Sequence, residues 1–203
     1  VAHECSHVEV TGTYEAAFPG VLLRKRFTDM RDKVRSDVIL ACWDEYAATR
    51  LSARFGEDPT EGYEESLITH MGSARQEANE AIKAYRLHSD LVKVYCDVYR
   101  AYGNLLKFSA YYLGNLAGHG EAMSLRPKFE ATLAGHWFED YFHQLDEACN
   151  AIAAQYGAWR DHSVFEVIGD IVDDMVTKGG VLCSTLEDGS MNIDIPFTPE
   201  TMP

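Results

Sequence analysis

The chain of 203 residues lacks long apolar runs and is poor in basic side chains. No stretch reaches the ~18 consecutive apolar residues that a membrane-spanning helix needs. The chain has only 18 Lys and Arg residues but 32 Asp and Glu residues, which gives a formal net charge of −14. Phosphate backbones and anionic lipid surfaces attract basic proteins. We therefore expect neither nucleic acid nor a membrane as a partner.

Cysteine is also scarce, and the sequence motifs of several enzyme classes are missing. The five cysteines are scattered, and no Cys-x-x-Cys pair occurs. An odd number of separated thiols is more typical of reduced side chains in the cytoplasm than of a disulfide framework. The chain has no Gly-x-Gly-x-x-Gly, Walker or Gly-x-Ser-x-Gly motif. We expect a cytoplasmic protein without a nucleotide loop or a serine-hydrolase elbow.

The most specific pattern stands at the start of the chain, which reads His3-Glu4-Cys5-Ser6-His7 after two residues. On a helix, side chains four residues apart share a face, so His3 and His7 can bind one ion. A hydrolytic zinc site needs three protein ligands and an open position for water. Glu4 is the candidate general base that accepts the proton of that water. The competing interpretation is a surface helix with two ordinary histidines and a solvated glutamate.

A third ligand is expected from a later helix, where the segment WDEYAATRLSARF offers Asp44 and Glu45. Glu45 shares a line at helical spacing with small and apolar residues, namely Val34, Val38, Ala41, Ala48 and Ser52. Asp44 lies on the neighbouring line, with Leu40, Ala47 and Leu51. An unpaired carboxylate on a packed face is costly, and a cation compensates it. Periodicity does not choose between the two, and pairing with Arg31, Arg35 or Arg50 is the alternative to a metal.

Over about residues 1–55, His3-Glu4-x-x-His7 followed by Glu45-x-x-Ala48 resembles the gluzincin-type zinc metallopeptidases, especially the ImmA/IrrE-like group. The resemblance implies Zn²⁺ bound by His3, His7 and Glu45, rather than by Asp44. It also implies that Glu4 is the catalytic base and that the substrate is a peptide or protein.

The resemblance has departures. Thr49 stands where the group usually has Asn or Asp, and Cys5-Ser6 replaces an apolar-Gly pair. Zincins usually place a sheet before the active-site helix, whereas only two residues precede His3 here. We therefore expect an upstream segment or a partner chain to complete the site.

Helical periodicity and breakers predict a mainly α protein with a C-terminal β-hairpin. We expect helices over 27–56, over 64–114 as one or two pieces, over 128–159 and over 163–180. Residues 10–26 contain Gly12, Pro19 and Gly20 and are expected to form a loop, as is the link 57–66. Asp188-Gly189 stands between two alternating runs and predicts the hairpin turn.

Two further clusters have more than one interpretation. His136, Asp140 and His143 recur at helical spacing, either as a second metal face or as the polar side of an amphipathic helix. His136 is also a candidate for stabilising an oxyanion at the zinc site. The tyrosines of 95–112 line a peptide groove or belong to the core.

The expected organisation is a zincin-like helical protein. Residues 1–58 form the zinc-binding active-site region, and residues 59–203 form a helical bundle or cap with the hairpin, continuous with the first region or separate from it. The expected activity is zinc-dependent hydrolysis of peptide bonds by metal-activated water. The alternative is a non-catalytic helical interaction module whose metal site is decayed or purely structural.

Overall fold

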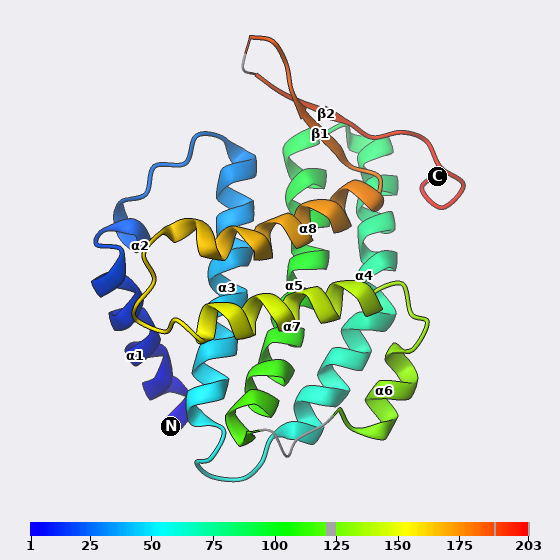
Figure 1. The fold of residues 1–203 in the computed structure, drawn as a ribbon. Helices are drawn as coiled ribbons and strands as arrows, with labels where there is room; N and C mark the ends of the chain where they lie inside the picture. The colour runs from blue at the N-terminus through cyan, green and yellow to red at the C-terminus, as the bar shows by residue number, and fades with distance from the viewer. Residues whose placement is uncertain (121–124, 189, 203) are drawn as a thin grey trace.

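The chain folds into helices followed by one two-stranded hairpin, as the sequence predicts (Figure 1). The structure is a computed structural model that describes residues 1–120, 125–188 and 190–202, with only the backbone of Leu23. In chain order the elements are α1 (Ala2–Ala17), α2 (Val21–Arg24), α3 (Met30–Ser52), α4 (Thr60–His88), α5 (Leu91–His119), α6 (Pro127–Leu133), α7 (Glu139–Ala153), η1 (His162–Phe165), α8 (Glu166–Lys178), β1 (Leu182–Thr185) and β2 (Met191–Asp194).

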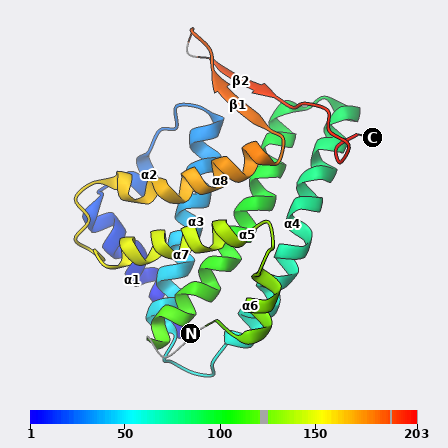
Figure 2. The same cartoon turned by 45° about the vertical axis from the view of Figure 1, so that its right-hand side comes forward.

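Three long helices form the centre of the molecule. α5 lies between α3 and α4, while α7 and α8 cross this layer on one side (Figures 1 and 2). A β-carbon on Gly114 would lie 2.2 Å from Thr49 Oγ1, and one on Gly118 would lie 2.4 Å from the carbonyl oxygen of Arg50. These two glycines therefore let α5 approach α3 closely. One hydrophobic core contains residues from both predicted regions, so the helix that carries Glu45 is part of the bundle.

Helix α1 packs along α3 and is longer than predicted. The expectation of a loop over 10–26 is wrong for its first part, because the helix continues to Ala17. Val10 and Tyr14 are buried, and the Tyr14 hydroxyl is hydrogen-bonded to His162. Gly12 has open space around it, so only its weak helix propensity opposes the helix. Packing of the buried face outweighs that cost of about 1 kcal/mol.

Several other boundaries differ from the prediction. The expected loop over 57–66 is wrong for its second part, because α4 begins at Thr60, and α5 continues past 114 to His119. The segment 128–159 is not one helix: α6 ends at Leu133 and α7 begins at Glu139, with Gly135 between them at φ +72°. Helix α3 begins at Met30 rather than at 27. Asp29 caps it, because the Asp29 carboxylate accepts a hydrogen bond from the Asp32 amide at 2.9 Å. The predicted helix over 163–180 is confirmed as η1 and α8.

The hairpin pairs β1 with β2 in antiparallel register, with Cys183 opposite Ile193. Gly189 of the predicted turn lies outside the described residues. In the described part of the chain, every helix is too short or too polar to cross a lipid bilayer.

Candidate metal centre

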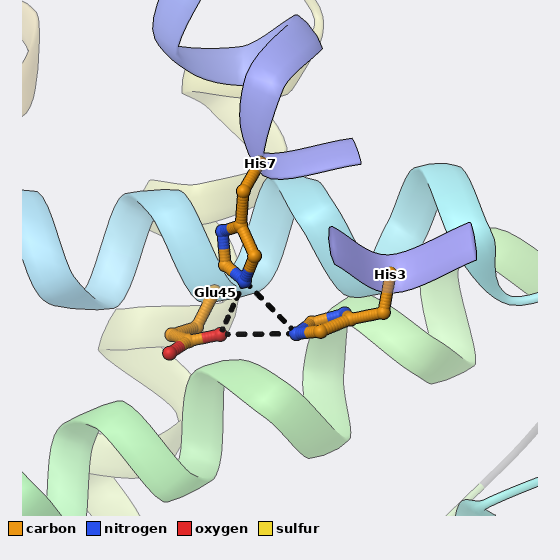
Figure 3. A group of neighbouring side chains, drawn as sticks. All are labelled: His3, His7 and Glu45. Atoms are coloured by element: carbon orange, nitrogen blue, oxygen red, sulfur yellow. Dashed lines mark hydrogen bonds and ion pairs between the residues drawn. The ribbon is translucent and has the colours of Figure 1, made fainter. Parts of the chain in front are cut away.

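His3, His7 and Glu45 converge on one point, although they come from two helices (Figure 3). His3 and His7 are one turn apart on α1, and Glu45 is on α3, which packs beside it. The two histidine Nε2 atoms are 3.0 Å apart. Glu45 Oε2 lies 3.4 Å from His3 Nε2 and 3.5 Å from His7 Nε2. The three atoms form a nearly equilateral triangle.

The size of this triangle fits a tetrahedral zinc ion. Zinc bonds of about 2.0–2.2 Å in tetrahedral geometry place neighbouring ligand atoms about 3.3–3.6 Å apart. The two distances from Glu45 Oε2, 3.4 and 3.5 Å, fall in this range. The distance of 3.0 Å between the histidine nitrogens is shorter by a few tenths of an ångström. A small rotation of one imidazole ring closes that difference.

The hydrogen bonds within the triangle do not satisfy its atoms. A carboxylate oxygen accepts only, and a neutral imidazole has one donor and one acceptor nitrogen. Glu45 Oε2 and His3 Nδ1 are both buried without a hydrogen-bond partner among the described residues. Such an orphaned carboxylate oxygen is costly. A cation in the triangle satisfies Glu45 Oε2 and both Nε2 lone pairs together.

Asp44 lies behind the triangle and orients His7. Its Oδ2 is 2.9 Å from His7 Nδ1. Because the ionised carboxylate can only accept, His7 donates from Nδ1 and presents the lone pair of Nε2 to the triangle. A carboxylate that holds the outer nitrogen of a histidine is the usual support of a zinc ligand. The geometry thus separates the two carboxylates that periodicity left open: Glu45 faces the centre, and Asp44 supports His7.

The arginine alternative has no support among the described contacts. Arg31 and Arg35 form ion pairs with Asp173 on α8, and Arg35 also pairs with Glu166 and Asp170. Thr49, where the resembled group has Asn or Asp, donates its hydroxyl to the carbonyl oxygen of Glu45 at 2.5 Å. Its role is therefore in the packing of α3 rather than at the metal triangle.

The three side chains of the centre are partly exposed to solvent. The side chains of His3, His7 and Glu45 are 25%, 23% and 16% exposed. Glu4 is exposed on α1. By helix geometry it projects about 100° from His3 and about 60° from His7, so it flanks the metal-facing side of the helix. Cys5 is also exposed, about 160° from His7, and points away from the centre.

Tyr111, one of the tyrosines of 95–112, lies beside the metal triangle, a place that sequence reasoning did not assign to it. The other tyrosines of 95–112 are buried in the core, namely Tyr95, Tyr99, Tyr102 and Tyr112. Tyr111 is half-buried, and its ring centroid lies 5.9 Å from that of His3. Burial raises the pKa of Tyr111 above its usual value, and the negative charge of the nearby Glu45 carboxylate raises it further. The phenol therefore stays protonated and offers a donor beside the triangle.

The second predicted cluster does not join the centre. His136 precedes α7, accepts a hydrogen bond from the Phe138 amide at 3.3 Å and contacts the ring of Trp137. Among the described residues, the group of potential metal ligands consists of His3, His7 and Glu45. The interpretation of His136, Asp140 and His143 as a polar helix face is therefore the better one.

Comparisons with known proteins give no family for this chain. No family model matches it, and neither a curated protein nor a solved structure does.

Proposed function

We propose that the protein binds one Zn²⁺ through His3, His7 and Glu45 and hydrolyses peptide bonds. The observation that carries the proposal is the triangle of two imidazole nitrogens and one carboxylate oxygen at 3.0–3.5 Å. Two imidazoles and a glutamate are the donor set of a large class of hydrolytic zinc sites. The residues present fit the ion in type, in number and in spacing.

The count of ligands favours a catalytic site over a structural one. Structural zinc sites are usually closed by four protein ligands, whereas catalytic sites keep one position for water or substrate. The group here has three members among the described residues. The partial exposure of all three leaves room for a substrate on the solvent side.

The chain's own residues take distinct parts in the reaction. Bound zinc supplies a Lewis acid that makes a water molecule nucleophilic near neutral pH. Glu4 accepts the proton of the attacking water and delivers it to the departing amine. Asp44 keeps His7 in the tautomer that binds the metal, and the protonated Tyr111 hydroxyl lies close to the Glu45 carboxylate.

The test begins with metal content, before any substrate is known. The purified chain should contain about one zinc per molecule after exposure to zinc and dialysis. His3→Ala should lose it while circular dichroism stays unchanged. A screen of peptides should then give cleavage that a chelator stops and added zinc restores. A chain that retains no zinc above the His3→Ala level contradicts the proposal, and zinc without any cleavage favours the non-catalytic module.

A further inference from the structure

A hollow of about 520 Å³ lies between the C-terminal ends of α3 and α5 and the end of α7. Its size is within the range of about 300–1,000 Å³ that is usual for small-molecule sites. The lining contributed by α3 is on the far side of that helix from the metal triangle, since Ala47 and Arg50 project about 160° and 140° from Glu45. The lining residues are Trp43, Tyr46, Ala47, Arg50, Leu51, Arg54, Phe55, Ala117, Gly118, Ala153 and Tyr156.

Most of the lining is apolar and aromatic. Trp43 and Tyr46 are buried, and their rings are stacked with centroids 6.0 Å apart. Leu51, near the end of α3, and Phe55, just beyond it, line the hollow and are 41% and 69% exposed. Exposed apolar side chains next to a concave surface are typical of a binding site. This part of the hollow suits the flat apolar body of a small molecule.

Two arginines give the hollow its charge. Arg50 lies on α3 and Arg54 lies just after its end, and both positive side chains line the hollow. The chain carries a formal charge of −14, yet none of its described acidic side chains pairs with either arginine. Arg54 donates from Nε to the carbonyl oxygen of Gly118 at 3.0 Å, which fixes its guanidinium beside the hollow. The remaining N–H groups suit a planar anion.

We propose that this hollow binds a small amphipathic acid. Its carboxylate would lie between Arg50 and Arg54, and its flat apolar body would contact the aromatic lining. A carboxylate there offsets the positive charge of the two guanidinium groups and accepts their hydrogen bonds. The hollow shares none of the metal ligands, so the site stands apart from the proposed hydrolysis.

Isothermal titration with 2-naphthoate tests the site, with its uncharged analogue 2-naphthamide as the matched ligand. We expect the acid to bind once per chain and the amide to bind at least about tenfold more weakly, because only the acid pairs with the arginines. The double variant Arg50→Gln with Arg54→Gln should bind both compounds equally weakly. Replacing the exposed Arg26 and Arg160 by Gln removes the same charge elsewhere and should leave the difference intact.

A second variant distinguishes binding inside the hollow from attraction to positive charge on the surface. Ala117→Leu places bulk in the hollow but keeps both arginines, and it should weaken the acid and the amide alike. His3→Ala should bind 2-naphthoate as the wild type does, whatever the outcome of the zinc experiment. Absence of saturable binding by 2-naphthoate overturns the proposal. Equal affinity of acid and amide, or unchanged affinity in the arginine double variant, does so as well.

Discussion

His7 Nδ1 lies 2.9 Å from the Asp44 carboxylate, while His7 Nε2 lies 3.5 Å from the Glu45 carboxylate. Two adjacent acidic residues thus hold opposite edges of one imidazole ring. Glu45→Gln removes a charged ligand and should abolish stable zinc binding. Asp44→Asn removes only the support of His7 and should weaken zinc affinity by about 10–100-fold. Competition with a chromogenic chelator measures both.

Each of these two variants also removes one negative charge near a cation, so a control variant must remove a negative charge elsewhere. Glu9→Gln, on the exposed side of α1, removes a charge from the same helix without touching the triangle and should leave zinc affinity nearly unchanged. Undiminished zinc in Glu45→Gln would remove Glu45 from the centre. Equal losses in Glu45→Gln and Asp44→Asn would mean that the two carboxylates are not separated as ligand and support.

Tyr111→Phe tests the phenol beside Glu45. The variant keeps the ring near His3 and removes only the hydroxyl. We expect zinc to stay bound with at most a severalfold loss of affinity, since the metal ligands remain. Tyr112→Phe removes a hydroxyl of the next residue, which faces the Arg126 amide instead, and serves as the control. An identical effect of both variants on zinc affinity would deny Tyr111 a particular role.

The contact of α3 with α5 depends on Gly114. An added β-carbon there would lie 2.2 Å from Thr49 Oγ1 and 2.3 Å from the Tyr46 carbonyl oxygen, so the helices must move apart. Gly114→Ala should lower the free energy of unfolding by about 1–3 kcal/mol, as overpacking does. Gly72 is exposed on α4 with no atom near its missing β-carbon. Gly72→Ala should raise stability by about 0.5–1 kcal/mol, and urea melts compare the two.

Sequence patterns predicted correctly those elements that interactions between neighbouring residues determine. The hairpin and α8 follow from alternation and from terminal glycines, and the structure confirms both. The extent of α1 was not predictable in this way, because Val10 and Tyr14 are buried in the folded protein and Tyr14 is hydrogen-bonded to His162, far along the chain. The break before α7 was missed because Leu133, Trp137 and Tyr141 keep the apolar period of four residues across it.

The candidate site, too, was predictable from local sequence only in part. Spacing alone selected His3 and His7 as a pair on one helix face, and the structure places them together. The choice between Asp44 and Glu45 depends on the angle at which α1 lies on α3. Asp44 and Glu45 project about 100° apart on α3. When α1 packs between them, one edge of the His7 ring faces Asp44 and the other faces Glu45. That docking angle results from tertiary packing, which periodicity within α3 does not contain.

Asp146 gives a pH-dependent prediction away from the metal. Burial raises the pKa of its carboxyl above the ordinary value of 3.8, although the Asn150 side chain donates to it at 2.8 Å. A raised pKa means that the folded state binds the proton more tightly, so this residue costs stability as the pH rises through the shifted pKa. Asp146→Asn cannot ionise and keeps the oxygen that Asn150 needs. Its Tm should exceed that of the wild type by about 1–3 °C at pH 7.

The difference between Asp146→Asn and the wild type should vanish as the pH falls below 3.8, where the aspartate is protonated in both the folded and the unfolded state. Glu77→Gln removes one negative charge from an exposed position on α4 and controls for the general effect of net charge. An equal gain from Glu77→Gln at pH 7 would assign the effect to overall repulsion rather than to burial of Asp146.

Glu4→Gln separates the base from the metal ligands. Glu4 is exposed and flanks the face of α1 that carries His3 and His7, so its loss leaves the triangle intact. Glutamine has the same size but cannot accept a proton. We therefore expect one zinc per chain, an unchanged circular dichroism spectrum, and a turnover lowered by about 10²–10⁴-fold, as for a lost general base. His7→Ala is the contrast, because it should lose both metal and activity.

The two readouts together decide the role of Glu4. Loss of zinc in Glu4→Gln would make Glu4 a ligand and would require a different centre from the triangle of Figure 3. Wild-type turnover with zinc retained would place water activation on another group and contradict the proposed hydrolysis. Glu9→Gln, also exposed and more than one turn further along α1, should change neither readout, because it lies beyond the reach of a water molecule held at the triangle.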